Sequence, residues 1–288
     1  MTAKNDALTA LRQEIDEIDA ELHRLFMRRA EVVEEVGRVK GRSNTAVFAP
    51  GREALVLHKL LARHEGQFPR QSLLRIWREM MPAYAAMQAD MPIAVFASDD
   101  NRRCWDLARD HFGSHVPLTP YDSAADVLDQ VASGAAVVGV LPAPKSEKDT
   151  ADSNESSSSD SNESDDAPWW RNLCEQDRPC VVSSLPFAYG SNAWAGSHDA
   201  YAVARIIPDA TGDDRSLVCV SAKGAAAAVD ALKSAGFSGR AIASDGPDFH
   251  MIEVDAFLLA GDSRIAALDA DATVIGAYAA PIRDSIGS

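Results

Sequence analysis

Residues 7–42 read ALTALRQEIDEIDAELHRLFMRRAEVVEEVGRVKGR, and this stretch decides how the first ninety residues fold. Apolar side chains recur in it at steps of three and four, the spacing of a buried helical face; they are Leu8, Leu11, Ile15, Ile18, Leu22, Leu25, Val32, Val36 and Val39. Arg29 occupies the position that should continue this face between Leu25 and Val32. A buried guanidinium is costly unless an anion meets it, so Arg29 either pairs with a neighbouring carboxylate or faces an anionic ligand.

Helical geometry decides which other cations can meet the same ligand as Arg29. Lys40 lies eleven residues further on, and at about 100° per residue it returns to nearly the same face, roughly 16 Å along the axis. Arg12 lies seventeen residues before Arg29, about 25 Å away and rotated by about a quarter turn. Arg12 therefore cannot reach a small ligand held by Arg29 of the same helix, although Arg12 of a symmetry-related helix can.

Two shorter amphipathic helices are predicted after this long one. The first runs from about Arg52 to His64, after a loop rich in Gly, Ser, Asn and Pro. The second begins near Pro69, because proline suits a first helical turn. Two short helices cannot cover one of over thirty residues. We therefore expect an all-α three-helix domain that forms an intertwined dimer, in which the long helices pack on each other.

The order and spacing of the charged residues in this region resemble the AroQ-type, all-α chorismate mutase domain that opens the bifunctional P-proteins of phenylalanine biosynthesis. The family pattern has an LR pair and an Asp in the first helix, an RR pair, a VGxxK segment, an RE pair after a loop and a Gln near the end of the third helix. The matching positions are Leu11 and Arg12, Asp19, Arg28 and Arg29, Val36 to Lys40, Arg52 and Glu53, and Gln88.

The resemblance implies a chorismate mutase, an enzyme that rearranges chorismate to prephenate without proton transfer or a covalent intermediate. Such a site holds the reactive conformer of a dianion and stabilises charge on the breaking ether oxygen. The implied roles are carboxylate binding by Arg29 and the partner subunit's Arg12, donation to the ether oxygen by the catalytic pair Lys40 and Gln88, contact with the ring hydroxyl by Glu53, and completion of the cationic wall by Arg52. No metal or cofactor is expected.

Each of these residues also has an ordinary structural interpretation. Taken singly, Arg12 and Arg52 are typical of solvated surface charges, and Gln88 is typical of an exposed helix residue. Lys40 suits a helix carboxyl end, and Glu53 suits a first helical turn. Only the joint spacing of these residues favours a substrate site.

Two positions differ from the family pattern near the substrate. Ala49 stands where many relatives have an Asp close to the substrate hydroxyl, and Tyr84 stands where a Ser commonly meets a carboxylate. Pro82 precedes Tyr84 within the third helix, where proline removes a backbone hydrogen bond. We expect an active enzyme with a reshaped or slower pocket.

Strands alternate with helices from Pro92 onward, which indicates a parallel α/β unit. This stretch resembles the first lobe of prephenate dehydratase, although VVGVLPAPKS (137–146) lacks the Glu and Asn of that family's Pro-x-Glu-Asn-Ser segment. The last six elements are predicted to run strand, helix, strand, strand, helix, strand. This is a ferredoxin-like order, and it resembles the ACT regulatory domain that ends P-proteins.

The carboxy-terminal half departs from both of these families at their motifs. Ala204, Arg205 and Ile206 stand in place of a Thr-Arg-Phe triplet, whose Thr is the expected proton donor of the dehydratase. KGAAA (223–227) and ASDGP (243–247) stand in place of the GAL and ESRP segments with which ACT domains sense phenylalanine. The resemblance therefore indicates a degenerate region, from which the second dehydratase lobe is missing.

The predicted chain is multidomain. Its parts are an all-α domain (1–91), a partial α/β lobe (92–145), a disordered acidic Ser-rich linker (146–168) and a degenerate dehydratase segment with an ACT-like α+β domain (169–288). The net charge of −15 argues against a nucleic-acid partner. No apolar run approaches the ~20 residues of a membrane span and no signal peptide is present, which favours a cytoplasmic protein. The cysteines and histidines have no metal-ligand spacing.

Three functions remain open at this point. A chorismate mutase is favoured by the complete cationic set of the helical domain. A non-catalytic or regulatory module that docks another shikimate-pathway enzyme is favoured by the degenerate carboxy-terminal half. A working bifunctional mutase–dehydratase is the least favoured, because the dehydratase motif is lost.

Overall fold

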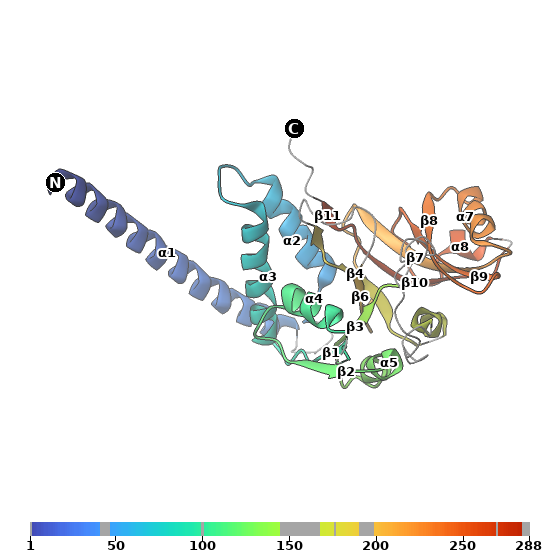
Figure 1. Cartoon of the computed structure of the whole chain (residues 1–288). Coiled ribbons are helices and arrows are strands. Elements are labelled where there is room, and N and C mark those ends of the chain that lie inside the picture. The colour runs from blue at the N-terminus through green and yellow to red at the C-terminus, as the bar shows by residue number, and fades with distance from the viewer. Residues whose placement is uncertain are drawn as a thin grey trace, which may run out of the picture.

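A computed structural model describes residues 2–40, 47–98, 101–144, 168–175, 177–189, 199–268 and 270–283, with all of their side chains except those of residues 2, 3, 40 and 283. The linker predicted at 146–168 lies outside these residues, apart from Pro168. Figure 1 shows a long helix, α1, that projects from a body in which the other helices lie beside a large sheet.

The secondary structure follows the predicted order of elements. The helices are α1 (Thr2–Lys40), α2 (Pro50–Ala62), α3 (Arg70–Ala86), α4 (Arg103–Phe112), α5 (Ala124–Ser133), the short 3-10 helix η2 (Trp169–Cys174), α7 (Ala225–Ser234) and α8 (Ser263–Ala266). The strands are β1 (Ile93–Phe96), β2 (Leu118–Tyr121), β3 (Val138–Pro142), β4 (Cys180–Leu185), β5 (Ala188–Tyr189), β6 (Ala200–Ala204), β7 (Asp214–Ser221), β8 (Gly239–Asp245), β9 (Phe249–Val254), β10 (Ala272–Ala279) and β11 (Ile282–Arg283).

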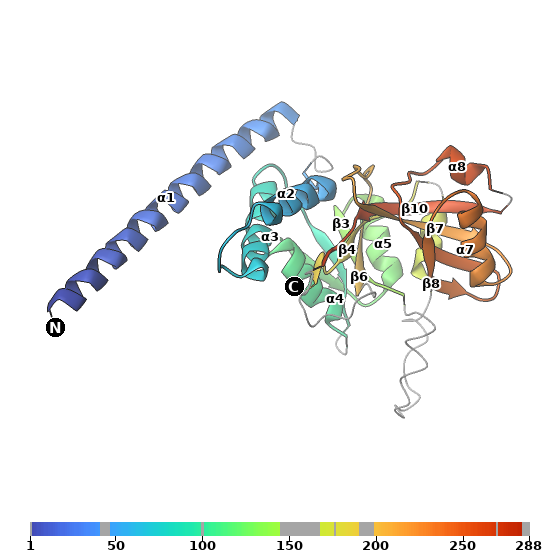
Figure 2. The same ribbon diagram turned by 90° about the horizontal axis from the view of Figure 1, so that it is seen from above.

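α1 leaves its apolar face uncovered along most of its length. Leu11, Ile15 and Ile18 are 57%, 56% and 52% exposed. The other exposed apolar residues of α1 are Leu8, Leu22, Leu25, Phe26, Met27, Val32, Val36 and Val39. Figures 1 and 2 both show α1 extending away from the body, which it meets near its carboxyl end. We call the stripe of residues at three-and-four spacing, without Phe26 and Met27, the α1 seam, and an exposed apolar stripe of this length is typical of a protein interface.

The other two amino-terminal helices pack on the carboxy-terminal half of the chain. One core cluster contains α2 and α3 residues together with residues from the sheet and the turn after β4. Its members are Ala54, Leu57, Leu61, Leu74, Met81, Phe187, Ala279 and Ile282. A Cβ on Gly51, at the start of α2, would lie 2.9 Å from the carbonyl oxygen of Asp209, so this contact is close. The helical part therefore does not complete its core alone.

Nine strands form one mixed sheet, in the order β2-β1-β3-β6-β4-β10-β7-β9-β8. The pairs β2–β1 and β1–β3 are parallel, as the strand–helix alternation predicts. β6 then lies antiparallel between β3 and β4. The elements from β7 to β10 follow the predicted strand-helix-strand-strand-helix-strand order, and each pair of neighbouring strands among them is antiparallel. An α/β region with a mixed sheet therefore follows the helical part.

The sheet is joined in its middle by a close contact between β4 and β10. Gly276 of β10 pairs with Val181 of β4, and a Cβ on Gly276 would lie 2.2 Å from the carbonyl oxygen of Val181. Only glycine permits this approach. The two predicted carboxy-terminal domains share this sheet and one main core. The domain boundaries, and a separate ACT-like domain, remain predictions.

No helix among the described residues combines the length and the apolar composition that crossing a bilayer requires. The same part of the chain contains no cluster of three or more His, Cys, Asp or Glu side chains that could hold a metal ion.

Candidate functional site

Arg29 lies where α1 meets α3, and its guanidinium stacks on an aromatic ring. Its Cζ atom is 4.3 Å from the ring centroid of Tyr84. The Nη1 atom of Arg29 is buried and has no hydrogen-bond partner within the described residues. The carboxylate partner that one interpretation of the sequence offered is thus absent from this part of the chain. An unpaired, buried donor on a cation is suited to meeting an anion.

Tyr84 holds α3 against α1 rather than extending its hydroxyl into a site. The Tyr84 hydroxyl donates to the backbone carbonyl of Phe26, at 2.8 Å, and the Tyr84 side chain is buried. Where relatives commonly have a Ser that meets a carboxylate, this chain therefore has a ring that supports Arg29. The family comparison identified the substitution, but only the packing of α1 on α3 shows its effect.

Gln88 follows α3 and lies against the carboxyl end of α1. A Cβ on the buried Gly37 would lie 3.1 Å from Cγ of Gln88, so the two helices approach closely here. Gly37 is one turn before Lys40, which is the last residue of α1. The Lys40 side chain is outside the described part of the structure. The structure thus brings Gln88 to the stretch of α1 between Arg29 and Lys40.

Glu53 forms a buried ion pair that the sequence analysis did not predict. Its Oε2 accepts from Nη1 of Arg78 on α3, at 3.0 Å, and the two side chains are 14% and 10% exposed. Burial raises the pKa of Glu53, while the charge of Arg78 opposes this rise. Arg78 also lies 3.4 Å from Nε2 of His111 on α4. Glu53 is therefore held in place by a cation from another helix.

Arg12 and Arg52 are exposed to solvent in the single chain. Arg12 lies on the projecting part of α1, about 25 Å along the axis from Arg29. Within one chain the structure therefore places Arg29 on Tyr84 and Gln88 on Gly37, about two turns further along α1, and it leaves Arg12 far from Arg29. A ligand held by Arg29 can meet Arg12 only from a second copy of α1.

Arg78 and His111 were missed, although the sequence contained a signal for Arg78. Arg78 follows Leu74 by four residues and precedes Met81 by three, and both of these residues are buried in the core. A cation at that spacing interrupts an apolar helical face in the same way as Arg29 does in α1. No signal in the sequence singles out His111.

The positions that depart from the dehydratase and ACT patterns have structural roles. Ala204 is fully buried at the end of β6, and it pairs with Val138 and Cys180. The neighbouring Arg205 donates to the carbonyl of Ala132, at 2.7 Å, and is exposed. The KGAAA segment forms the start of α7, and the ASDGP segment ends β8. The hydroxyl of the expected proton donor therefore has no counterpart at Ala204.

The described amino-terminal part consists of helices, and it combines the unpartnered Nη1 of Arg29 with the exposed α1 seam. Residues 11–89 match the family model for chorismate mutase type II.

Several curated proteins are similar to this chain. The bifunctional chorismate mutase/prephenate dehydratase of Pseudomonas aeruginosa is 33% identical over 149 residues, which are 50% of this chain and 40% of that protein. The protein of the same name from Aquifex aeolicus is 30% identical over 141 residues, 48% of this chain and 39% of that protein. The T-protein of Haemophilus influenzae is 46% identical over 52 residues, 18% of this chain and 14% of that protein. The matches thus span about two fifths of each bifunctional relative.

Solved structures also align with the chain. The prephenate dehydratase of Streptococcus mutans aligns with 67% of this chain and 99% of its own, with 13% identity and a TM-score of 0.42.

Proposed function

We propose that this protein is a chorismate mutase that converts chorismate to prephenate. The observation that carries this proposal is the buried Nη1 of Arg29, which has no partner among the described residues. The match of residues 11–89 to the chorismate mutase family supports it. Since the guanidinium is held by the Tyr84 ring, it is positioned before a substrate carboxylate arrives.

The reaction needs positioning and charge stabilisation rather than acid–base chemistry. In the proposed site, Arg29 and the partner subunit's Arg12 bind the two carboxylates, and Arg52 adds positive charge. Lys40 and Gln88 donate to the ether oxygen, on which negative charge develops as its bond to the ring breaks. Glu53, oriented by Arg78, accepts from the ring hydroxyl.

We further propose a homodimer in which two α1 seams cover each other. Each fully buried Leu, Ile or Val contributes about 1.5–3 kcal/mol, and the seam contains mostly such residues. The same association brings the partner's Arg12 towards Arg29. The dimer is thus proposed both to cover the seam and to complete the substrate site.

One assay separates the three functions that the sequence left open. Purified protein is incubated with chorismate without added metal or cofactor, and the product is identified. We expect prephenate to accumulate without conversion to phenylpyruvate, because Ala204 has no hydroxyl to donate a proton. Unchanged chorismate would favour a non-catalytic module, and protein-dependent phenylpyruvate at neutral pH would favour a bifunctional enzyme.

Sharing of the site between subunits predicts that inactive variants complement each other. Arg12→Ala and Lys40→Ala are each expected to be inactive, and they are mixed under conditions that allow subunit exchange. At full exchange half of the dimers are mixed, and each has one intact site, so about a quarter of the wild-type activity should return. If exchange is demonstrated and no activity returns, both residues act within one chain.

A further inference from the structure

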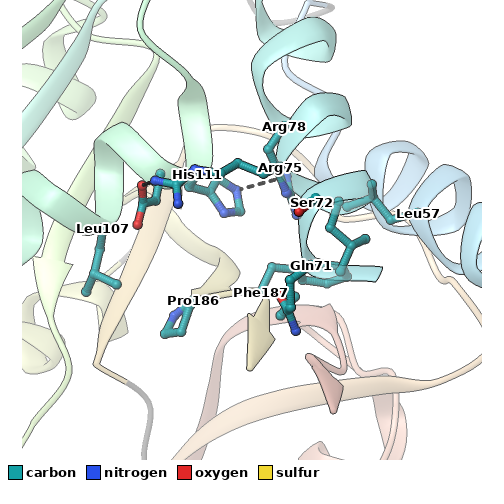
Figure 3. A pocket seen from close by; sticks show the side chains of 12 residues that line it. Leu57, Gln71, Ser72, Arg75, Arg78, Leu107, His111, Pro186 and Phe187 are labelled. Atoms are coloured by element: carbon teal, nitrogen blue, oxygen red, sulfur yellow. Dashed lines mark hydrogen bonds and ion pairs between the residues drawn. The ribbon is translucent and has the colours of Figure 1, made fainter. Parts of the chain in front are cut away.

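A cavity of about 250 Å³ lies between α3, α4 and the turn that joins β4 to β5 (Figure 3). It is therefore built from both the mutase helices and the α/β region. Its apolar wall includes Leu57, Leu107, Pro186 and Phe187. An apolar cavity of about 150 Å³ holds a benzene molecule, so this space accepts a single ring with one substituent.

The polar wall of the cavity contains one buried cation. Figure 3 shows Arg78 and His111 side by side at the cavity. The Cζ atom of Arg78 lies 4.8 Å from the ring centroid of Phe187. Burial, together with the charge of Arg78, lowers the pKa of His111 well below its usual value, so the imidazole is neutral at pH 7. Arg78 is therefore the buried positive charge of this wall.

Some N–H donors of Arg78 make no hydrogen bond to another described residue. A guanidinium has five N–H donors. The hydrogen bonds of Arg78 to other described residues, Glu53 and His111, both use Nη1. The donors on Nε and Nη2 are thus left for a further acceptor.

The mouth of the cavity is open to solvent and close to neutral. Arg75 and Asp110 pair across it at 2.5 Å, with side chains 76% and 61% exposed. Ser72 and Gln71 are exposed residues of α3 at the same rim. A ligand can therefore enter from water, and the buried charge that it meets is Arg78.

We propose that this cavity binds a small carboxylic acid whose apolar part is about the size of one ring. The ring packs against Leu107, Pro186 and Phe187, and the carboxylate accepts from Arg78. A cation would be repelled by Arg78, and a neutral ring would leave the guanidinium donors unused.

Binding in this cavity is coupled to Glu53, because both carboxylates use Arg78. An acid that draws Arg78 towards the cavity weakens its hold on Glu53, which acts in the proposed mutase site. This coupling rests on the proposed function, whereas the binding does not. Ligands of the cavity should therefore slow the mutase without competing with chorismate.

The binding test uses 4-fluorobenzoate as the probe and fluorine NMR on the full-length protein. We expect saturable binding, and binding at least about tenfold weaker for 4-fluorobenzyl alcohol, which has the same ring without the charge. Ser72→Trp, which covers the mouth from an exposed position, should weaken probe binding at least about tenfold. Ser72→Ala is the matched control and should bind as the wild type does.

A second variant tests the role of Arg78 because it should increase the affinity for the probe. Glu53→Gln removes the competing carboxylate, so 4-fluorobenzoate should bind at least about threefold more tightly. Arg29→Ala, which alters the proposed substrate site, should leave probe binding unchanged. The proposal is overturned if the wild type shows no saturable binding, if Ser72→Trp binds normally, or if Arg29→Ala abolishes binding.

Steady-state kinetics measures the coupling between the cavity and the proposed mutase site. With 4-fluorobenzoate bound, kcat should fall while KM for chorismate stays unchanged, and Ser72→Trp should be insensitive to the probe. If the protein binds the probe but leaves chorismate unchanged, the proposed function is wrong and the proposed binding site is still supported. Probe binding with an unaltered mutase rate would overturn the coupling alone.

Discussion

Replacing Arg29 by Ala should lower kcat/KM for chorismate at least about a hundredfold, which corresponds to about 3 kcal/mol of lost transition-state binding. The substitution removes the proposed charge-assisted hydrogen bonds and leaves a substrate carboxylate unpaired. Because Nη1 has no hydrogen-bond partner in the described part of the free chain, the contact that the substitution removes within the chain is the stacking of the guanidinium on Tyr84. The measurement is steady-state kinetics together with thermal unfolding.

The neighbouring Arg28 provides a matched control. Its side chain is 66% exposed and pairs with Glu31 on the same face of α1. Such surface pairs contribute about 0–1 kcal/mol, so Arg28→Ala should keep kcat/KM within about twofold of the wild type. Equal losses in Arg28→Ala and Arg29→Ala would show that Arg29 has no special contact with the substrate. A large fall in the melting temperature of Arg29→Ala alone would assign it a structural role.

Placing two aspartates in the α1 seam should dissociate the proposed dimer and abolish activity. Ile15 and Leu22 are 56% and 48% exposed in the single chain and lie two turns apart on one face. Ile15→Asp with Leu22→Asp puts four carboxylates into the dimer contact, where unpaired buried charge costs several kcal/mol. Sedimentation should give the mass of one chain instead of two, and circular dichroism should show lost helix.

The same two substitutions on the opposite face of α1 separate seam effects from charge effects. Gln13 and Ala20 are exposed, have the same spacing, and lie more than a third of a turn from the seam. Gln13→Asp with Ala20→Asp should leave the mass and the activity of the dimer unchanged. A seam variant that remains dimeric and active would refute the proposed dimer contact.

The amino-terminal helices were predictable because their signals are local. The three-and-four spacing of the α1 seam predicts a helix, and Arg29 is conspicuous as its one interruption. The helix ends follow from Pro69 and from the loop before α2. The family pattern then added roles for residues such as Gln88, which no spacing rule would single out.

The contacts between the halves of the chain were not predictable in this way. The Glu53–Arg78 pair depends on how α2 packs on α3, and the cavity beside it also depends on the turn that carries Phe187. The position of β6 between β3 and β4 is likewise a long-range pairing. Periodicity describes which face of an element is buried, but it does not identify what covers that face.

One core is shared between the two halves of the chain, and this affects synthesis of the protein. It joins α2 and α3 to Phe187, Ala279 and Ile282. Residues more than 200 positions apart in the chain pack together there, and β10 lies in the middle of the sheet although it is synthesised late. The ribosome adds residues at about 5–20 per second, so the first helices wait many seconds for the strands that cover them. During that interval the nascent chain exposes both the α1 seam and the uncovered face of α2. We therefore expect chaperones that recognise apolar surface to bind this protein mainly during its translation.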